Sequence, residues 1–311
     1  MAEILGCMAM SHGPQLLTPP DKWPELPTRI KGPFHPKPGI EAELTPEAMR
    51  AHAARCDAAI GQLRDRLAAW APDVVLIVGD DQNENLLMDA MPPFTIFTGR
   101  EVDATLKYRY AGTKATDQMT RYVVNAELAE ELVYGLMEAG FDPAWSRQTR
   151  FEAGLGHAFG RALNFLLPDA DRAIVPVMVN TYFPPAPSAK RCLDFGAALG
   201  RAIAASERPL RLVVVGSGGL SHTKIDERLD QEFIGAVTSH DIDYMGSMPD
   251  DVLTTGTSEI RNWIVVAGCA GVMGTMVDYV PCYRNADGVG CAMGFAYWVP
   301  ERQRRDKGGL R

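Results

Sequence analysis

Three histidines follow apolar runs or turns, which are positions where functional side chains are often found in proteins that contain a sheet. His12 and His222 each follow an apolar run and a serine, and His157 follows a Gly-Leu-Gly turn. Imidazole is the commonest metal ligand in proteins and the usual general acid or base near neutral pH. A structural role remains open for each histidine alone, but the shared strand-Ser-His context of His12 and His222 favours one common site.

Carboxylates and amides could supply the other half of a metal site. The stretch 80–84, Asp-Asp-Gln-Asn-Glu, follows a second apolar run, and Glu259 lies at the start of a predicted helix. Each has a simpler explanation as well, because turns favour Asp and Asn and the first turn of a helix favours an acid. Taken with the histidines, these residues predict that the site holds a metal ion.

The remaining histidines are expected to have no part in this chemistry. His52 falls on the polar side of a predicted helix, and His240 belongs to a Ser-His-Asp sequence in a predicted surface segment. Both are expected to be solvated. His35 lies in a proline-rich segment, where it could reach a pocket as part of a lid, although a surface loop is the simpler interpretation.

Four apolar runs must position the candidate site residues. They cover residues 4–10, 74–78, 174–179 and 212–215, and a polar residue or a glycine followed by polar residues comes after each. The carboxyl ends of parallel strands meet at one edge of an open sheet, where ligands bind. The pattern therefore predicts an α/β fold, a single domain with a central, mostly parallel sheet flanked by helices. This domain is expected to cover residues 1–300, and residues 301–311 are expected to form a charged tail.

Capping signals and apolar spacing mark the helices that flank this sheet. Thr45-Pro46-Glu47 combines a hydroxyl cap, a proline at the first helical position and an acid in the first turn. Apolar residues then recur every three or four positions as far as Trp70, which is typical of an amphipathic helix. Further helices are expected over 125–140 and about 189–205, a short strand over 94–97, an ordered loop or lid over 13–46, and no regular element over 99–120.

Composition excludes several classes of protein. The 311 residues carry a formal net charge of −8 without a basic cluster, which argues against nucleic acid or an anionic membrane as a partner. No apolar stretch approaches the roughly 20 residues that span a bilayer, and a cytoplasmic location is expected. The six cysteines show no CxxC spacing, so reduced thiols are expected rather than disulfides or a thiolate zinc site.

The motifs together resemble the class III extradiol ring-cleavage dioxygenases, the family that includes the β chain of protocatechuate 4,5-dioxygenase. Similarity extends over nearly the whole chain, and its most specific part is the Gly-Gly-Leu-Ser-His sequence that ends at His222. The other matching segments are Ser11-His12, Gly79 to Gln82, Asn180 to Pro185, Glu259 with Trp263, and Tyr283 to Ala296.

This resemblance implies a ligand set and a reaction. The family binds one Fe(II) through two histidines and a glutamate, and the arrangement leaves positions open for substrate and dioxygen. His12 would be the first ligand, Glu259 the carboxylate ligand, and His222 the acid/base residue that accepts a proton from the catechol and returns it. The implied partners are dioxygen and a small catecholic aromatic acid, similar to protocatechuate or gallate, and a homo-oligomer is expected from chain size and family.

One departure from the family pattern concerns the second nitrogen ligand. The family commonly has an Asp-His pair after the second strand, where this chain has Asp81-Gln82. Glutamine is a neutral oxygen donor and a poor substitute for imidazole on iron. Our working assignment takes Gln82 as the ligand and places His157 beside His222 as a catalytic residue, with Asp81, Glu84 or His157 as alternative ligands.

Two other functions remain open on the sequence. A metal-dependent hydrolase or another non-oxygenase on the same fold would suit an oxygen-rich ligand set, because fold does not fix function. A non-catalytic binding subunit is disfavoured by the joint presence of His12, His222 and Glu259. In an enzyme that acts on an aromatic acid, cationic candidates for the substrate carboxylate are Lys107, Arg109, Lys114 and Arg191.

Overall fold

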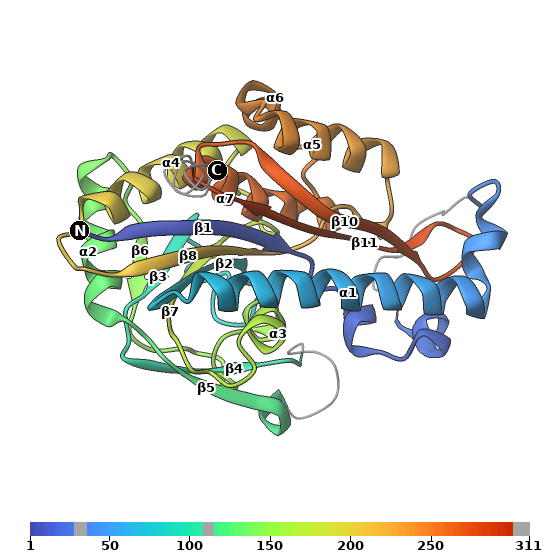
Figure 1. Ribbon diagram of the computed structural model, residues 1–311, viewed down its shortest axis with the longest axis horizontal. Coiled ribbons are helices and arrows are strands. Elements are labelled where there is room, and N and C mark those ends of the chain that lie inside the picture. The colour runs from blue at the N-terminus through green and yellow to red at the C-terminus, as the bar shows by residue number, and fades with distance from the viewer. Residues whose placement is uncertain (28–35, 108–114, 301–311) are drawn as a thin grey trace, which may run out of the picture.

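A single mixed sheet organises the protein. In the computed structural model, which describes residues 1–27, 36–107 and 115–300, nine strands join in the order β10-β11-β1-β8-β2-β7-β3-β6, and β9 pairs with β11 (Figure 1). The strands are β1 (Glu3–Met10), β2 (Val74–Asp80), β3 (Phe94–Phe97), β6 (Ala144–Ser146), β7 (Ala173–Val179), β8 (Arg211–Ser217), β9 (His222–Lys224), β10 (Gly274–Tyr283) and β11 (Val289–Trp298).

The centre of the sheet is parallel, and an antiparallel pairing flanks it on each side. Neighbours in the series β1-β8-β2-β7 all run in the same direction, whereas β11 pairs with β1 and β3 pairs with β7 in the antiparallel sense. These four central strands are the four apolar runs identified in the sequence. Their carboxyl ends therefore meet at one edge, and the expected α/β class with a mostly parallel central sheet is confirmed.

Alternating side chains of the central strands build two separate cores. Leu76 and Val214 belong to one apolar cluster, and their neighbours Ile77 and Val215 belong to the other. Such alternation is the two-residue period of a strand that is buried on both faces. Helices must cover both faces of the sheet as a result.

The helices divide between the two faces (Figure 1). Residues of α1 (Pro46–Trp70) and α3 (His157–Leu166) pack into one cluster, and residues of α2 (Ala126–Glu138), α4 (Ala189–Ala205), α5 (Glu227–Ser239) and α7 (Ile260–Ala270) pack into the other. A short helix, α6 (Ile242–Ser247), follows α5. The helices predicted over 45–70, 125–140 and about 189–205 are confirmed, and Thr45 caps α1 by accepting the Ala48 N–H.

Two features arise where the sequence predicted no regular element. The strands β4 (Glu101–Thr105) and β5 (Met119–Val123) form a separate two-stranded sheet, and α3 begins at His157. The strands of this small sheet carry exposed polar residues on one side, so only Val102, Ala104 and Tyr122 mark their buried side. That signal is too short for a periodicity argument.

The proline-rich segment before α1 folds into short 3-10 helices. They are η1 (Pro14–Leu17), η2 (Pro20–Glu25) and η3 (Ile40–Leu44), and residue 35 lies outside the described residues. The expectation that His52 is solvated is wrong. η3 packs over the start of α1, so His52 is buried and its Nε2 lies 3.1 Å from Glu43 Oε2. His240, also expected to be solvated, is half-buried at the C-terminal end of α5.

Two further findings bear on the class of protein. Within the described ranges, no helix combines the length and the apolar character needed to cross a membrane. All six cysteines are free thiols, and five of them are buried. Reduced cysteines that pack as small apolar side chains are therefore confirmed.

Candidate metal centre

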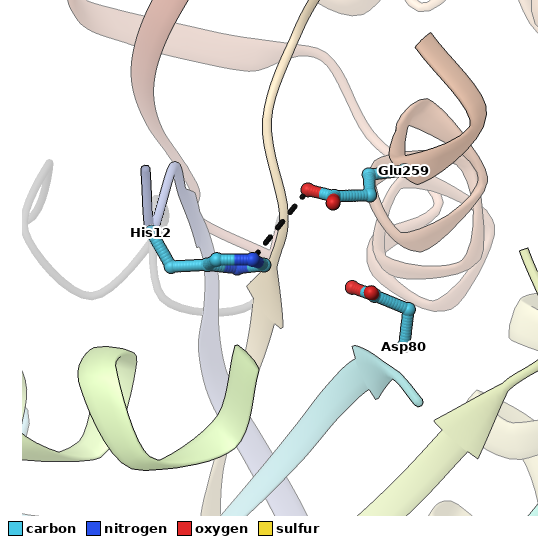
Figure 2. Close-up of side chains that lie close together, drawn as sticks. All are labelled: His12, Asp80 and Glu259. Atoms are coloured by element: carbon cyan, nitrogen blue, oxygen red, sulfur yellow. Dashed lines mark ion pairs between the residues drawn. The ribbon is translucent and has the colours of Figure 1, made fainter. Parts of the chain in front are cut away.

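Three buried side chains converge at the carboxyl edge of the sheet. His12 follows β1, Asp80 is the last residue of β2, and Glu259 ends the short helix η5 (Thr255–Glu259) just before α7. One ligand atom from each lies within 4.8 Å of the others, and Figure 2 shows the three side chains directed toward one another. Each is exposed by 4% or less. Among the described residues, this is the one group of histidine, cysteine and acidic side chains with metal-binding geometry.

The hydrogen bonds of His12 determine which ring nitrogen faces the cluster. Ser217 Oγ donates to the Ala158 carbonyl, so it can only accept from the His12 Nδ1–H, at 3.1 Å. Burial lowers the pKa of His12 to about 3, which keeps the ring neutral at pH 7. Nε2 therefore presents a lone pair, 3.7 Å from Glu259 Oε2. Two acceptors that face each other in a buried site are stabilised by a cation between them.

Glu259 is held from several sides. Its Oε2 accepts the Gly219 N–H at 3.0 Å, and its Oε1 accepts from the Tyr182 hydroxyl at 3.0 Å. A side chain at Gly218 would crowd Glu259, so this glycine allows the close approach of β8 and η5. Burial would raise the pKa of Glu259, but His222, His12 and the Gly219 N–H together outweigh burial and lower the pKa well below the ordinary range.

His222 lies beside the cluster rather than within it. Its Nδ1 lies 3.3 Å from the Leu220 carbonyl, and its Nε2 lies 3.0 Å from the Tyr182 hydroxyl and 3.3 Å from Glu259 Oε1. Burial disfavours the charged ring, but the Glu259 carboxylate, the Leu220 carbonyl and Asp230 together outweigh burial and raise the pKa of His222. The side chain is 19% exposed, which is more than any of the three converging residues. This imidazole can therefore exchange a proton with a bound molecule.

Asp80 is fixed by two amide groups. Asn262 Nδ2 donates to its Oδ1 at 3.2 Å, and Gln82 Nε2 donates to its Oδ2 at 2.9 Å. Gln82 Nε2 also donates to Glu259 Oε1 at 3.1 Å. Burial and the nearby Glu259 carboxylate raise the pKa of Asp80. Gln82 thus lies at the cluster as expected, but it presents its amide nitrogen to the carboxylates.

The other candidate ligands of the Asp80–Glu84 stretch have different partners. The carboxylate of Asp81 accepts the backbone N–H groups of Glu84, Asn85 and Leu86 and so caps a turn. Glu84 lies 2.9 Å from His157 Nδ1 in a second buried pair. The ring centroids of His157 and His12 are 5.2 Å apart. His157 therefore lies against the candidate ligand His12 and outside the converging group, and its expected catalytic role stays a prediction.

The cationic candidates for a substrate carboxylate do not gather at the cluster. Arg191 is exposed, stacks over the Phe141 ring and donates to the Gly140 carbonyl. Lys107 is half-buried near the end of β4, and residues 109 and 114 lie outside the described residues. A cation that the sequence did not single out is closer, because Arg161 of α3 donates to the His12 carbonyl at 3.0 Å.

Sequence reasoning missed four residues of the site. Asp80 lay within the quoted acidic stretch but was not considered as a ligand, and Tyr182 lay in a family-like motif without a role. Ser217 and Asn262 gave no signal, because a hydroxyl at the end of a strand and an amide on a helix are both common. The alternation of side chains along β2 is the signal that could have separated Asp80 from Asp81.

Comparison with known proteins identifies the family. The family model described as the catalytic LigB subunit of aromatic ring-opening dioxygenase matches residues 6–284. The chain belongs to this family. The resemblance drawn from the strand-end motifs is thereby confirmed, and the match includes the three converging residues and His222.

Two curated relatives are about a third identical to this chain over the region that matches. The 2,3-dihydroxyphenylpropionate/2,3-dihydroxicinnamic acid 1,2-dioxygenase of Paraburkholderia xenovorans is 33% identical over 197 residues, which is 63% of this chain and 54% of that protein. The protein of the same name from Klebsiella pneumoniae is 30% identical over 184 residues, or 57% of this chain and 54% of that protein. The matched region thus spans about half the length of these relatives.

A solved structure shows the same fold at low sequence identity. The crystal structure of an uncharacterized protein from Escherichia coli K12 covers 94% of this chain and 99% of its own, with a TM-score of 0.51 and 13% identity. At that level of identity the likeness concerns the fold alone. It supports the single α/β architecture described above.

Proposed function

We propose that this protein is a metal-dependent extradiol dioxygenase that opens the ring of a catecholic aromatic acid with dioxygen. The observation that carries the proposal is the lone pair of His12 Nε2, which faces two buried carboxylates next to a more exposed histidine. Family membership and the names of the curated relatives agree with this reaction.

The converging residues fit a divalent cation. One neutral imidazole and two carboxylates offer a lone pair and two negative charges in a buried site, and the Gln82 amide that bridges the carboxylates carries no net charge. His12, Asp80 and Glu259 would hold the ion, and we propose Fe(II). When bound, it would bring the catechol and dioxygen together and allow electrons to pass between them.

The protein itself would supply orientation and proton transfer. His222 is placed to accept a proton from a substrate hydroxyl at Nε2 and to return it later, because this nitrogen faces the cluster from its more exposed side. Tyr182 holds this edge of the imidazole and one oxygen of Glu259 together. The buried strand ends below the cluster would exclude water from the far side of the site.

The substrate class is tested by dioxygen uptake. We would purify the protein without oxygen, load it with Fe(II), and supply 2,3-dihydroxyphenylpropionate, protocatechuate and gallate in parallel. A 3,5-dihydroxy isomer serves as a control, because its hydroxyls are not adjacent and cannot chelate one ion. Uptake with an adjacent diol, with both atoms of labelled dioxygen in the opened product, supports the proposal. Absence of uptake with every adjacent diol contradicts it.

A metal-dependent hydrolase is the second candidate. The oxygen-rich donor set favours it, because carboxylate ligands suit ions that carry out no redox chemistry. The same uptake experiment separates the two functions, since hydrolysis consumes no dioxygen. A homo-oligomer, expected from chain size and family, is also a proposal, and light scattering of the purified protein tests it.

A further inference from the structure

The Asp80 carboxylate is buried, and within residues 1–27, 36–107 and 115–300 its hydrogen-bond partners include no cation. Its oxygens accept from Asn262 and Gln82, and both donors are neutral amides. The side chain is 0% exposed, and the Glu259 carboxylate belongs to the same cluster. Two buried carboxylates repel each other and lose their hydration, and neutral hydrogen bonds offset only part of this. A cation would neutralise both.

The Gln82 amide lies between the carboxylates of Asp80 and Glu259 and donates hydrogen bonds to both. Ionised carboxylates only accept hydrogen bonds, so the amide must turn its NH₂ group to Asp80 Oδ2 and to Glu259 Oε1. Its hydrogens thus occupy positions where a positive charge is favoured. The lone pair of His12 Nε2 is directed at the same cluster.

We propose that Asp80 is the third protein ligand of the metal centre, and that this set of one imidazole and two carboxylates lets Mn(II) compete with Fe(II). Imidazole suits later first-row metals such as iron and zinc, whereas carboxylate oxygens suit Mn(II) and other hard ions. A second carboxylate in place of a second imidazole therefore shifts the preference toward the harder ion. Gln82 acts as an outer partner that orients both carboxylates.

This inference rests on the proposed function only in requiring a metal site, and metal binding can be measured without turnover. Equilibrium dialysis of the metal-free protein, followed by elemental analysis, gives the affinities for Mn(II) and for Co(II), an air-stable substitute for Fe(II). The electron paramagnetic resonance spectrum of Mn(II) separately reports its bound fraction.

The decisive variant is Asp80→Asn, which keeps the size of the side chain and removes its charge. We expect its Mn(II) affinity to fall by more than the about 10–100-fold that loss of an outer partner costs. Asp230→Asn is the matched control, because it also removes a fully buried carboxylate, one that hydrogen-bonds to Ser221 and Tyr279. Its Mn(II) affinity should equal that of the wild type.

A second variant tests selectivity and remains informative if Asp80→Asn fails to fold. Gln82→His places an imidazole beside the two carboxylates, and we expect the ratio of Co(II) to Mn(II) affinity to rise about tenfold or more, equal to a change of about 1.4 kcal/mol. An unchanged ratio in Gln82→His, or wild-type Mn(II) affinity in a folded Asp80→Asn, overturns the inference and leaves the proposed function standing. A wild type that binds neither ion contradicts the proposed function itself.

Discussion

Two Ser-His pairs approach the same glutamate from different strands. Ser11-His12 follows β1 and Ser221-His222 lies beyond β8, and the two imidazoles face different oxygens of Glu259. His12 is 4% exposed and donates through Nδ1 to Ser217, whereas His222 is 19% exposed and shares Nε2 with Tyr182 and Glu259. The same dipeptide therefore gives a buried neutral ring in one place and a partly exposed ring with a raised pKa in the other.

The difference between His12 and His222 shows that the surroundings of a histidine determine whether its ring is suited to bind a metal ion or a proton. Desolvation lowers the pKa of His12 and leaves a lone pair suited to a metal ion, whereas at His222 the nearby Glu259 carboxylate, the Leu220 carbonyl and Asp230 together offset desolvation, raise the pKa and favour a bound proton. The two pairs also differ in their supports. The Ser11 hydroxyl bonds to backbone groups of Gly294 and Ala292, whereas the Ser221 hydroxyl donates to the Asp230 carboxylate.

The largest effect is expected at His12. We predict that His12→Ala loses its metal, because it removes a nitrogen donor that Ser217 holds in place. Metal content after anaerobic dialysis measures this. His52→Ala is the matched control, since His52 is also a buried histidine next to a glutamate, Glu43. Full metal content in His12→Ala would break the proposed division of roles.

A smaller but distinct effect is expected at His222. His222→Ala should keep its metal and lose about 10²–10⁴-fold in turnover, the usual contribution of a general acid or base. Metal analysis and dioxygen uptake on one preparation separate the two readouts. His240→Ala, at the end of α5, should change neither quantity. Loss of metal from His222→Ala would make this residue a ligand, and the contrast with His12 would disappear.

The support of His12 can be weakened without removing the ring. Ser217→Ala removes the acceptor of the Nδ1–H, so the tautomer and the ring orientation are less well fixed. We expect the metal affinity to fall about 10–100-fold. Ser206→Ala, which removes another serine hydroxyl that hydrogen-bonds, should leave the affinity unchanged. If dialysis gives equal affinities for both variants, the serine does not orient the ligand.

The smallest effect is expected in how the stability of the fold depends on pH. It arises at Asp230, whose carboxylate accepts a hydrogen bond from Ser221, the residue before His222. Burial raises the pKa of Asp230 from its ordinary 3.8 to about 6, so between these values the folded state binds more protons than the unfolded state. The stability that this group contributes is present below pH 4 and is lost as the pH rises through about 6. The loss is about 3 kcal/mol at most.

Urea unfolding at pH 4 and pH 7 tests this dependence. Asp230→Asn does not titrate, so the wild type should lose more free energy of unfolding over this range than the variant does. Ser11→Ala is the control on the other Ser-His pair, and its pH profile should match that of the wild type, because the bonds of Ser11 go to backbone groups. If the free energy of unfolding changes equally with pH in Asp230→Asn and in the wild type, Asp230 does not cause the pH dependence.

The sequence by itself determined the central elements and part of the site. Four apolar runs predicted the parallel strands, because a strand that is buried on both faces of a sheet has a nearly continuous apolar sequence. The Thr45 cap and the spacing that follows it specify α1. The strand-Ser-His motifs and Glu259 predicted residues that lie near one another in the structure, because the carboxyl ends of parallel strands share one edge. The small sheet of β4 and β5 and the helix α3 gave no comparable pattern, because their apolar faces are short.

The tertiary structure decided that an acid of the second strand joins His12 and Glu259, and strand alternation then selects Asp80 rather than Asp81. Asp80 and Asp81 are adjacent and chemically identical, but successive side chains of an extended chain point to opposite sides. Asp80 turns toward Glu259, and Asp81 turns to the backbone N–H groups of the following turn. Likewise, the burial of His52 depends on η3, which packs against α1. Such choices depend on which segments meet in space, and a local pattern of residue types does not contain that information.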